Sequence, residues 1–411
     1  MESNIIHQII KILSWTLLIF CLSASGTIAQ EEAHYDESNV PDYTLPKILE
    51  TSEGESVKTV NQWRYQRRPE IVNTFAEHVY GQMPKDFDSI EFNIINENNS
   101  AIDGSATAKQ VDIIITRYGN SLPIRLNLLI PNDIEKPVPV TLLMNHRGSE
   151  NMDITRETRE DFWPAETILE RGYAAAVFSV EDVADDDPET YTEDILETLY
   201  PEQIGKSNGM MALSAWGWGA MRVMDYLETD NDIDPKKSML VGHSRGGKAA
   251  LWTGANDDRW AIVVANESGA VGAALSKRRF GETVEIINNG FPYWFTPNFE
   301  AFNQNESEMP FDQHMLLAAI APRGVYITAA EDDQWADPKG MYESLLHASE
   351  VYEKIYGISV PLYERVPAIN NPTDNPYAGY HIRDGEHDLK LYDWEQFLNF
   401  ADRHFHINKY D

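Results

Sequence analysis

The feature that most constrains the fold is a series of short, continuous apolar runs that alternate with helical patterns. The runs cover residues 138–144, 174–180, 238–241, 262–265 and 325–329. Unbroken apolar strands are typical of parallel sheets whose two faces are both covered. Helical patterns follow at residues 163–171, 210–227, 248–253, 341–355 and 393–404. This order predicts an α/β chain with a doubly wound, mostly parallel sheet and helices on both faces.

A different pattern precedes the apolar runs. Residues 111–115 and 124–130 alternate apolar and polar side chains, which predicts antiparallel strands at the start of the sheet. Residues 61–80 carry apolar side chains at helical spacing, so we expect a helix before those strands. No linker rich in Gly, Ser or Pro divides the chain. We therefore expect one domain at residues 91–411, with residues 30–90 forming an arm and a helix packed on it.

The first 29 residues predict a secretory signal peptide. Lys11 precedes an apolar run at residues 12–22, and Thr27-Ile28-Ala29 offers small residues for cleavage. The alternative is a retained membrane anchor, but the run is shorter than the roughly 20 residues that span a bilayer. The single cysteine, Cys21, lies inside this leader. We expect a secreted or periplasmic protein without a membrane anchor, with neither a disulfide nor a cysteine nucleophile.

The charge of the chain excludes some classes of partner. Lys and Arg total 33 and Asp and Glu total 66, so the formal net charge is −33. A field of that sign repels phosphate backbones and anionic lipids, and we expect no nucleic-acid partner. The sequence contains neither a Gly-rich phosphate loop nor a His-Glu zinc motif, so we expect no cofactor and no metal. We also expect a monomer.

One motif indicates nucleophilic catalysis. The apolar run at residues 238–241 leads directly into Gly242-His243-Ser244-Arg245-Gly246, and a helical pattern follows. A G-x-S-x-G sequence between a strand and a helix is the nucleophile elbow of α/β-hydrolases, a sharp turn that exposes the serine hydroxyl above the sheet. We therefore expect Ser244 to be a nucleophile.

A serine nucleophile needs a base, and the base needs a carboxylate. Glu267 follows the run at 262–265, and Asp333 follows the run at 325–329, so either residue can supply the carboxylate. His387 lies in a loop before the last helical pattern, where hydrolases of this fold place their base. His381 is an alternative base.

Two cations accompany the nucleophile. The backbone N–H of Arg245, the residue after Ser244, is the usual first donor to an oxyanion, and its guanidinium adds a permanent positive charge. Lys248 lies one helical turn after Ser244. Two cations beside a nucleophile in an acidic chain suggest a polar or acidic substrate.

These motifs, taken together, resemble one family. Gly242-His243-Ser244-Arg245-Gly246-Gly247-Lys248-Ala249 is similar to the G-C-S-R-x-G-K-G motif of glucuronoyl esterases, carbohydrate esterase family 15. Further blocks resemble that family in the same order: Asn266-Glu267-Ser268-Gly269-Ala270, Phe280-Gly281-Glu282-Thr283, Phe311-Asp312-Gln313-His314, Ala321-Pro322-Arg323, and the bacterial-type Asp333-Gln334-Trp335-Ala336-Asp337-Pro338. The resemblance covers residues 210–390 and implies an α/β-hydrolase fold.

The resemblance also implies an activity, the hydrolysis of esters of (4-O-methyl-)glucuronic acid in glucuronoxylan, including ester links to lignin. It implies that Ser244 attacks, His387 relays the proton and Arg245 stabilises the oxyanion. Glu267 orients His387 by this resemblance, with Asp333 as the second candidate. The resemblance also implies that Lys248, Glu282 and Trp335 contact the sugar. The alternatives are an acetyl xylan esterase or another polysaccharide carboxylesterase, and a non-catalytic carbohydrate-binding protein.

The chain departs from the family pattern at two places. His243 replaces the cysteine of the motif, so the disulfide that fungal members form beside the nucleophile and the base is absent. Asn288-Asn289-Gly290 occupies the stretch where fungal members carry a second sugar-binding carboxylate. Both departures concern fine specificity and not the reaction class.

Overall fold

The computed structural model describes residues 32–373 and 375–407, and Ala33–Asp411 form one compact unit. The expected signal peptide at residues 1–29 lies outside the described residues. Within the described ranges, no helix is both long enough and apolar enough to cross a membrane.

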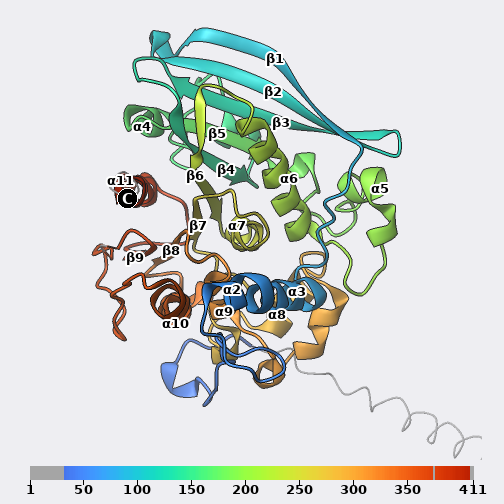
Figure 1. Ribbon diagram of the computed structural model, residues 1–411, viewed down its shortest axis with the longest axis vertical. Coiled ribbons are helices and arrows are strands. Elements are labelled where there is room, and N and C mark those ends of the chain that lie inside the picture. The colour runs from blue at the N-terminus through green and yellow to red at the C-terminus, as the bar shows by residue number, and fades with distance from the viewer. Residues whose placement is uncertain (1–31, 374, 408–411) are drawn as a thin grey trace, which may run out of the picture. The chain divides into compact units, whose positions relative to one another are not determined.

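A nine-stranded sheet organises this unit, with the strand order β1-β2-β3-β5-β4-β6-β7-β8-β9 (Figure 1). The strands are β1 (Ser89–Ala101), β2 (Ala106–Arg117), β3 (Asn120–Pro131), β4 (Val138–Asn145), β5 (Ala174–Ser179), β6 (Ile233–His243), β7 (Ile262–Asn266), β8 (Gly324–Ala330) and β9 (Ala378–Arg383). The first three are antiparallel, and β3 also pairs antiparallel with β5. All further neighbours are parallel. The predicted doubly wound sheet with an antiparallel start is confirmed.

The hairpin between β2 and β3 turns through two residues with positive φ. Tyr118 has φ 52° and Gly119 has φ 81°. Positive φ at both central positions is the geometry of the tight turns that match the twist of an antiparallel pair. The hairpin brings the two predicted alternating segments into register, with Ile113 opposite Ile124.

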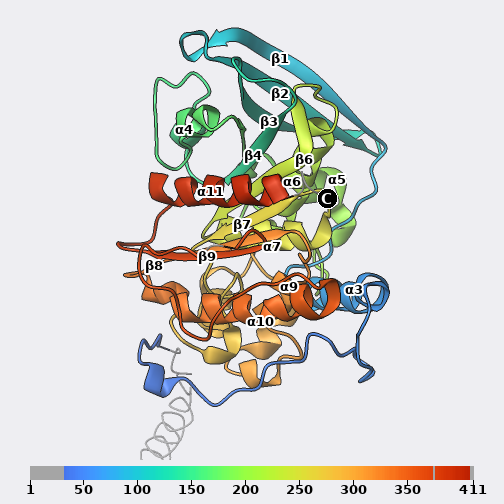
Figure 2. The same ribbon diagram turned by 60° about the vertical axis from the view of Figure 1, so that its left-hand side comes forward.

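Helices cover both faces of the sheet because successive residues of a strand point to opposite sides. On one face, Leu143, Val241 and Val264 pack in a cluster with Ile168 and Trp394. These two residues come from α4 (Ala165–Glu170) and α11 (Leu391–Ile407), which lie on the same side of the sheet in Figures 1 and 2.

The opposite face carries the larger part of the core. Leu142, Leu240 and Val263, each one residue before a residue of the first face, pack in a cluster with Trp216 and Leu251. The helices on this side include α6 (Ala212–Leu227), α7 (Arg245–Asn256) and α10 (Pro338–Tyr356). Shorter helices are α5 (Ile195–Leu199), α8 (Val284–Gly290) and α9 (Gln313–Ala318).

The helix expected at residues 61–80 is present but is not regular. It consists of α2 (Val60–Gln62), a π-helical turn at Trp63–Arg67 and α3 (Arg68–His78). Pro69 at the start of α3 has no N–H for a bond to the preceding turn, so a regular α-helical ladder cannot run through this point.

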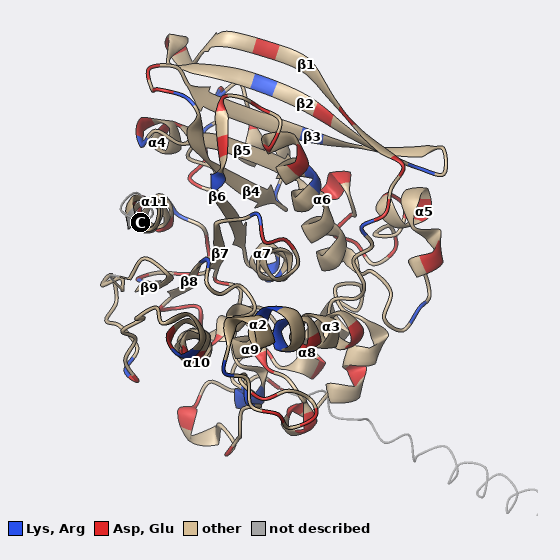
Figure 3. Cartoon of the chain, viewed as in Figure 1, with Lys and Arg blue, Asp and Glu red and all other residues tan. Residues whose placement is uncertain are grey.

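Acidic residues occur on strands, helices and loops throughout the drawn chain (Figure 3). The negative charge is therefore not confined to one segment.

Candidate active site

Ser244 occupies a sharp turn between β6 and α7. Its backbone has φ 53° and ψ −124°, a conformation that side chains other than glycine rarely adopt, and its N–H donates to Asn266 O at 2.8 Å. A Cβ atom on Gly242 would lie 2.0 Å from Gly246 O, so only glycine fits at the tightest point of the turn. The chain forms the strand–turn–helix geometry of a nucleophile elbow.

His387 lies in the loop between β9 and α11, and two carboxylates face its Nδ1 atom. Asp333 Oδ2 is 2.6 Å away and Glu267 Oε2 is 3.1 Å away. Glu267 follows β7 and Asp333 follows β8, so the carboxyl ends of two adjacent parallel strands bring the two acids together. Both acids expected from the sequence therefore contact the same histidine.

The two carboxylates differ in their other partners. Glu267 is fully buried, and its Oε1 accepts from Arg383 Nη2 at 2.6 Å. Its Oε2 accepts from the backbone N–H of Asp388 at 2.8 Å. Both carboxylates line the cavity beside His387. Of the two, Glu267 is the one that also bonds to Arg383 and to the backbone of Asp388.

The acids control the charge of His387. Burial lowers the pKa of the imidazole, but hydrogen bonds to Asp333 and Glu267 outweigh burial and raise this pKa to about 9. Burial raises the pKa of the Glu267 carboxyl to about 7, against the opposing effects of His387 and Arg383. The two carboxylates therefore favour the protonated form of His387.

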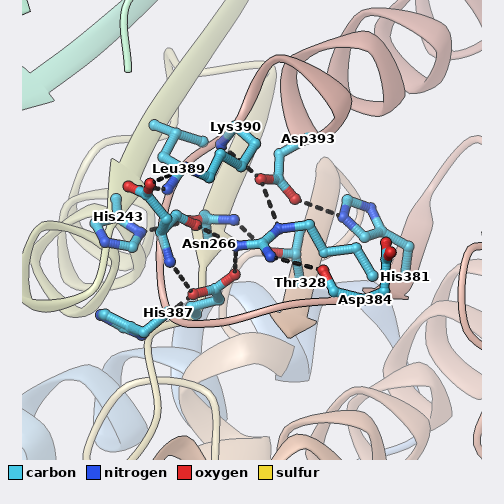
Figure 4. A network of polar contacts seen from close by, with 12 residues as sticks. His243, Asn266, Thr328, His381, Asp384, His387, Leu389, Lys390 and Asp393 are labelled. Carbon is cyan, nitrogen blue, oxygen red and sulfur yellow. Dashed lines mark hydrogen bonds and ion pairs between the residues drawn. The ribbon is translucent and has the colours of Figure 1, made fainter. Parts of the chain in front are cut away.

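His381, the alternative base, has a different environment. Its side chain is fully buried, with Nε2 2.8 Å from Asp393 Oδ1 (Figure 4). Its Nδ1 lies 3.1 Å from Tyr326 Oη. It does not line the cavity that contains Ser244. Both ring nitrogens are occupied inside the core, and among the described histidines it is His387 that lines the cavity with Ser244.

Arg245 is held by residues that the sequence did not single out. Its Nη1 donates to Asp186 Oδ2, and its guanidinium carbon lies 4.7 Å from the ring centroid of Trp294 and 5.4 Å from that of Phe291. Asp186 also accepts from Tyr293 Oη at 2.7 Å and from Trp294 Nε1 at 2.9 Å. A long-range contact between the loop after β5 and the loop after α8 thus fixes the cation, and local sequence gives no signal for it.

Lys248 is buried and does not lie on the protein surface. Its Nζ donates to Ser268 O at 2.8 Å and to Ala270 O at 2.6 Å, and lies 3.7 Å from Glu282 Oε2. Burial lowers the pKa of the Lys248 ammonium, and the charge of Glu282 opposes that shift. Trp335 is 43% exposed at the rim, and its carbonyl accepts from the N–H of Glu282 at 3.0 Å. The three expected sugar-contact residues are therefore neighbours.

A cavity of about 350 Å³ connects these groups. Its lining includes Ser244, Arg245, Lys248, Glu267, Glu282, Phe291, Trp294, Asp333, Trp335 and His387. The cavity combines a serine, a histidine with two acids, two cations and an aromatic wall. Such a set is suited to acyl transfer at a carbonyl carbon that carries a polar group.

Comparison with known proteins identifies close relatives. Residues 113–356 match the family model described as glucuronyl esterase of fungi. The chain is 35% identical to Carbohydrate esterase MZ0003 from an unknown prokaryotic organism, over 90% of this chain and 92% of the relative. It is 34% identical to the 4-O-methyl-glucuronoyl methylesterase of Podospora anserina, over 37% of this chain and 34% of that enzyme.

Solved structures agree with these sequence matches. A glucuronoyl esterase from Solibacter usitatus superposes with a TM-score of 0.82 at 35% identity, over 90% of this chain and 100% of that one. A promiscuous CE15 esterase from a marine bacterial metagenome superposes with a TM-score of 0.83 at 33% identity, over 91% and 100% of the two chains. The α/β-hydrolase fold expected from the sequence is confirmed.

Proposed function

Because the chain belongs to the glucuronoyl esterase family, carbohydrate esterase family 15, we propose that it hydrolyses esters of (4-O-methyl-)glucuronic acid through an acyl-enzyme on Ser244. The family consists of carboxylic ester hydrolases. The substrate in this proposal is glucuronoxylan, including its ester links to lignin. The observation that carries the proposal is the cavity in which a serine, a histidine and a buried Lys248–Glu282 pair meet.

The first half of the reaction forms the acyl-enzyme. Ser244 Oγ attacks the ester carbonyl carbon while His387 Nε2 takes the hydroxyl proton. The negative charge on the carbonyl oxygen is stabilised by the backbone N–H and the guanidinium of Arg245. When the tetrahedral intermediate collapses, His387 gives its proton to the leaving alcohol, and the sugar carboxyl remains esterified to Ser244.

The second half releases the acid. A water molecule attacks the acyl-enzyme while His387 takes a proton from it, and collapse returns that proton to Ser244 Oγ. The products are the uronic acid and the free serine. The two acids have different roles. Asp333 Oδ2 accepts a hydrogen bond from the Nδ1–H of His387 at 2.6 Å. Glu267 accepts from the backbone N–H of Asp388 in the adjoining loop and adds a second negative charge beside His387. This division moves the main orienting role from Glu267, favoured by the resemblance, to Asp333.

Sugar binding in this proposal depends on three further groups that line the cavity. Lys248 and Glu282 offer a donor and an acceptor to sugar hydroxyls, and Trp335 offers an apolar ring face. Lys248 Nζ carries three N–H groups, and two of them donate to Ser268 O and Ala270 O, so the third is available to a ligand. This polar, charged pocket supports a uronic acid over a simple acetyl group as the acyl part.

The experiment that tests the proposal compares acyl groups. The purified protein is assayed on benzyl glucuronate, methyl glucuronate and acetylated xylan, with free acid measured in each case. We expect turnover of both glucuronate esters and little release of acetate. Release of acetate with no hydrolysis of either glucuronate ester would identify an acetyl xylan esterase, and binding without any hydrolysis would identify a carbohydrate-binding protein.

Export belongs to the same proposal. A polysaccharide substrate lies outside the cytoplasm, and the sequence of residues 1–29 has the composition of a signal peptide. Fractionation of cells that produce the full chain tests this point. We expect the protein in the periplasm or the medium, with its N-terminus after residue 29, and recovery of the intact chain in the membrane fraction would contradict the proposal.

A further inference from the structure

Arg147, in the loop after β4, contacts both sides of the catalytic pair. Its Nη1 donates to Asp388 Oδ1 at 2.8 Å, and its Nη2 lies 3.3 Å from His243 Nε2. His243 is the residue before the nucleophile, and Asp388 is the residue after the base. Its guanidinium carbon lies 4.2 Å from the ring centroid of Phe162, which limits where this side chain can point. Arg147 does not line the cavity, so it acts through its neighbours and not on a substrate.

The hydrogen bonds around His243 define its tautomer. Asn266 Nδ2 donates to Thr328 Oγ1 at 2.6 Å, so Asn266 Oδ1 faces His243 Nδ1 and accepts a hydrogen bond from its N–H (Figure 4). His243 Nε2 is then an acceptor, which matches the always protonated guanidinium of Arg147. Burial, followed by the positive charge of His387, holds the pKa of His243 well below its usual range. His243 is therefore neutral.

A neutral His243 suits the base beside it. The ring centroids of His243 and His387 are 4.7 Å apart. His387 becomes a cation each time it takes a proton, and a second cation at this distance would oppose that step. The hydrogen bond from Arg147 therefore fixes the orientation of the His243 ring. Burial keeps the His243 ring itself uncharged.

Both the backbone and the side chain of Asp388 are fixed. Its N–H donates to Glu267 Oε2 at 2.8 Å, and its carbonyl accepts from Arg383 Nη2 at 2.8 Å. These two contacts anchor the base loop to the carboxyl ends of β7 and β9. The side chain of Asp388 pairs with Lys390 and with Arg147. Of these contacts, the one with Arg147 connects this loop to the nucleophile elbow through His243.

We propose that Arg147 is a positioning residue that ties the nucleophile elbow to the base loop through His243 and Asp388, and so fixes His387 relative to Ser244. The inference rests on the proposed roles of Ser244 and His387. A misplacement of about 1 Å between reacting groups can cost about a hundredfold in rate, so a single cross-link at this point has a large effect on turnover.

The test uses Arg147→Met, Asp388→Asn and their double variant, with two measurements. One is kcat and KM for benzyl glucuronate, and the other is the rate at which phenylmethylsulfonyl fluoride modifies Ser244. We expect each single variant to lower kcat at least about tenfold with KM changed by less than about twofold, and to slow sulfonylation similarly. The double variant should be no slower than the slower single variant, because both substitutions remove the same link.

Lys390→Met is the matched control. Lys390 Nζ also pairs with Asp388, but from the solvent side, with a side chain that is 50% exposed. This variant should have the kcat of the wild type. Arg147→Lys retains the charge without the second donor and is the variant to use if Arg147→Met does not fold; we expect a kcat between those of the wild type and Asp388→Asn.

Several results would overturn the proposal. They are a folded Arg147→Met protein with wild-type kcat, a loss that falls on KM alone, and a double variant whose loss is the product of the single losses. The sulfonyl fluoride does not contain the sugar. Wild-type sulfonylation without glucuronate hydrolysis would therefore refute the proposed substrate and still leave the role of Arg147 measurable.

Discussion

Asp333 Oδ2 lies 2.6 Å from His387 Nδ1, closer than the second carboxylate that faces the same ring nitrogen. The pair joins the carboxyl end of β8 to the loop before α11, so the charge of His387 depends on a contact between distant segments. The proposed mechanism needs a neutral His387, and each negative charge beside this side chain favours its protonated form.

Replacing Asp333 with Asn should change the pH dependence of the reaction. In the wild type, kcat/KM on an uncharged ester should rise with pH through an apparent pKa near 9, because the neutral form of His387 predominates only above that value. Asp333→Asn removes an anion that stabilises the imidazolium, so this limb should move to lower pH. At its own optimum the variant should retain about a tenth to a hundredth of wild-type kcat, since Glu267 remains.

The control for this change is Asp332→Asn, since Asp332 is the exposed neighbour of Asp333. Its pH profile should match that of the wild type. If kcat/KM of Asp333→Asn rises at the same pH as kcat/KM of the wild type, Asp333 does not set the charge of His387.

Replacing Glu267 with Gln should cost stability more than Asp333→Asn does. Glu267 is fully buried and accepts from Arg383 and from the backbone of Asp388, so its loss leaves a buried guanidinium with a weaker partner. Removing one member of a buried ion pair lowers the free energy of unfolding by about 3 kcal/mol. Urea unfolding of Glu267→Gln, Asp333→Asn and the exposed control Glu331→Gln measures the difference. Equal stability of the first two variants would refute the structural role given to Glu267.

Replacing Asp186 with Asn should weaken catalysis through Arg245. Asp186 accepts hydrogen bonds from Arg245 Nη1, Tyr293 Oη and Trp294 Nε1. It therefore fixes the Arg245 guanidinium against the aromatic wall of the cavity. Without that charge we expect kcat to fall about tenfold to a hundredfold, since a displaced donor stabilises the oxyanion less. The neighbouring Asp187 is exposed, and among the described contacts its side chain accepts only from the N–H of Glu189, so Asp187→Asn is the control. If Asp186→Asn keeps the wild-type kcat, the guanidinium of Arg245 does not contribute to stabilising the oxyanion.

Replacing Lys248 with Met should change the preference for the acyl group. We expect kcat/KM for benzyl glucuronate to fall about tenfold to a hundredfold, because a donor to sugar hydroxyls is lost. An ester with an acetyl group makes no such contact, so its kcat/KM should change by less than about threefold. Lys236→Met, which removes an exposed charge, controls for the change in net charge. Equal losses on the two esters would indicate a folding defect, and no loss on either would refute the contact with the sugar.

The parts of the fold that the sequence predicted are those whose burial has a simple pattern. The five apolar runs became β4 to β8 because both faces of these strands are covered. Two strands were missed. β1 is exposed along most of its length and rich in Asn, and its apolar alternation is confined to Ile90, Phe92 and Ile94. β9 contains the buried His381 and Arg383, which are compatible with the core because Asp393 pairs with both.

The candidate site divides in the same way. Ser244, Glu267 and Asp333 lie at or just after the ends of strands, and the edge of a parallel sheet brings such residues together, so sequence order was sufficient to predict that they are neighbours. Asp186, Arg147 and Arg383 make contacts with segments that are far away in the chain. No spacing rule connects such segments. The division of work between Glu267 and Asp333 also depends on Arg383 and was therefore left open by the sequence.

The central claim is that Ser244 is the nucleophile of a uronic-acid esterase, and the most direct test is hydrolysis of benzyl glucuronate by the wild type and by Ser244→Ala under identical conditions. The account predicts steady turnover by the wild type and a loss of at least about a thousandfold in kcat for a variant that folds and still binds the substrate. A wild type without activity on this ester, or a Ser244→Ala protein within about tenfold of the wild type, would contradict it.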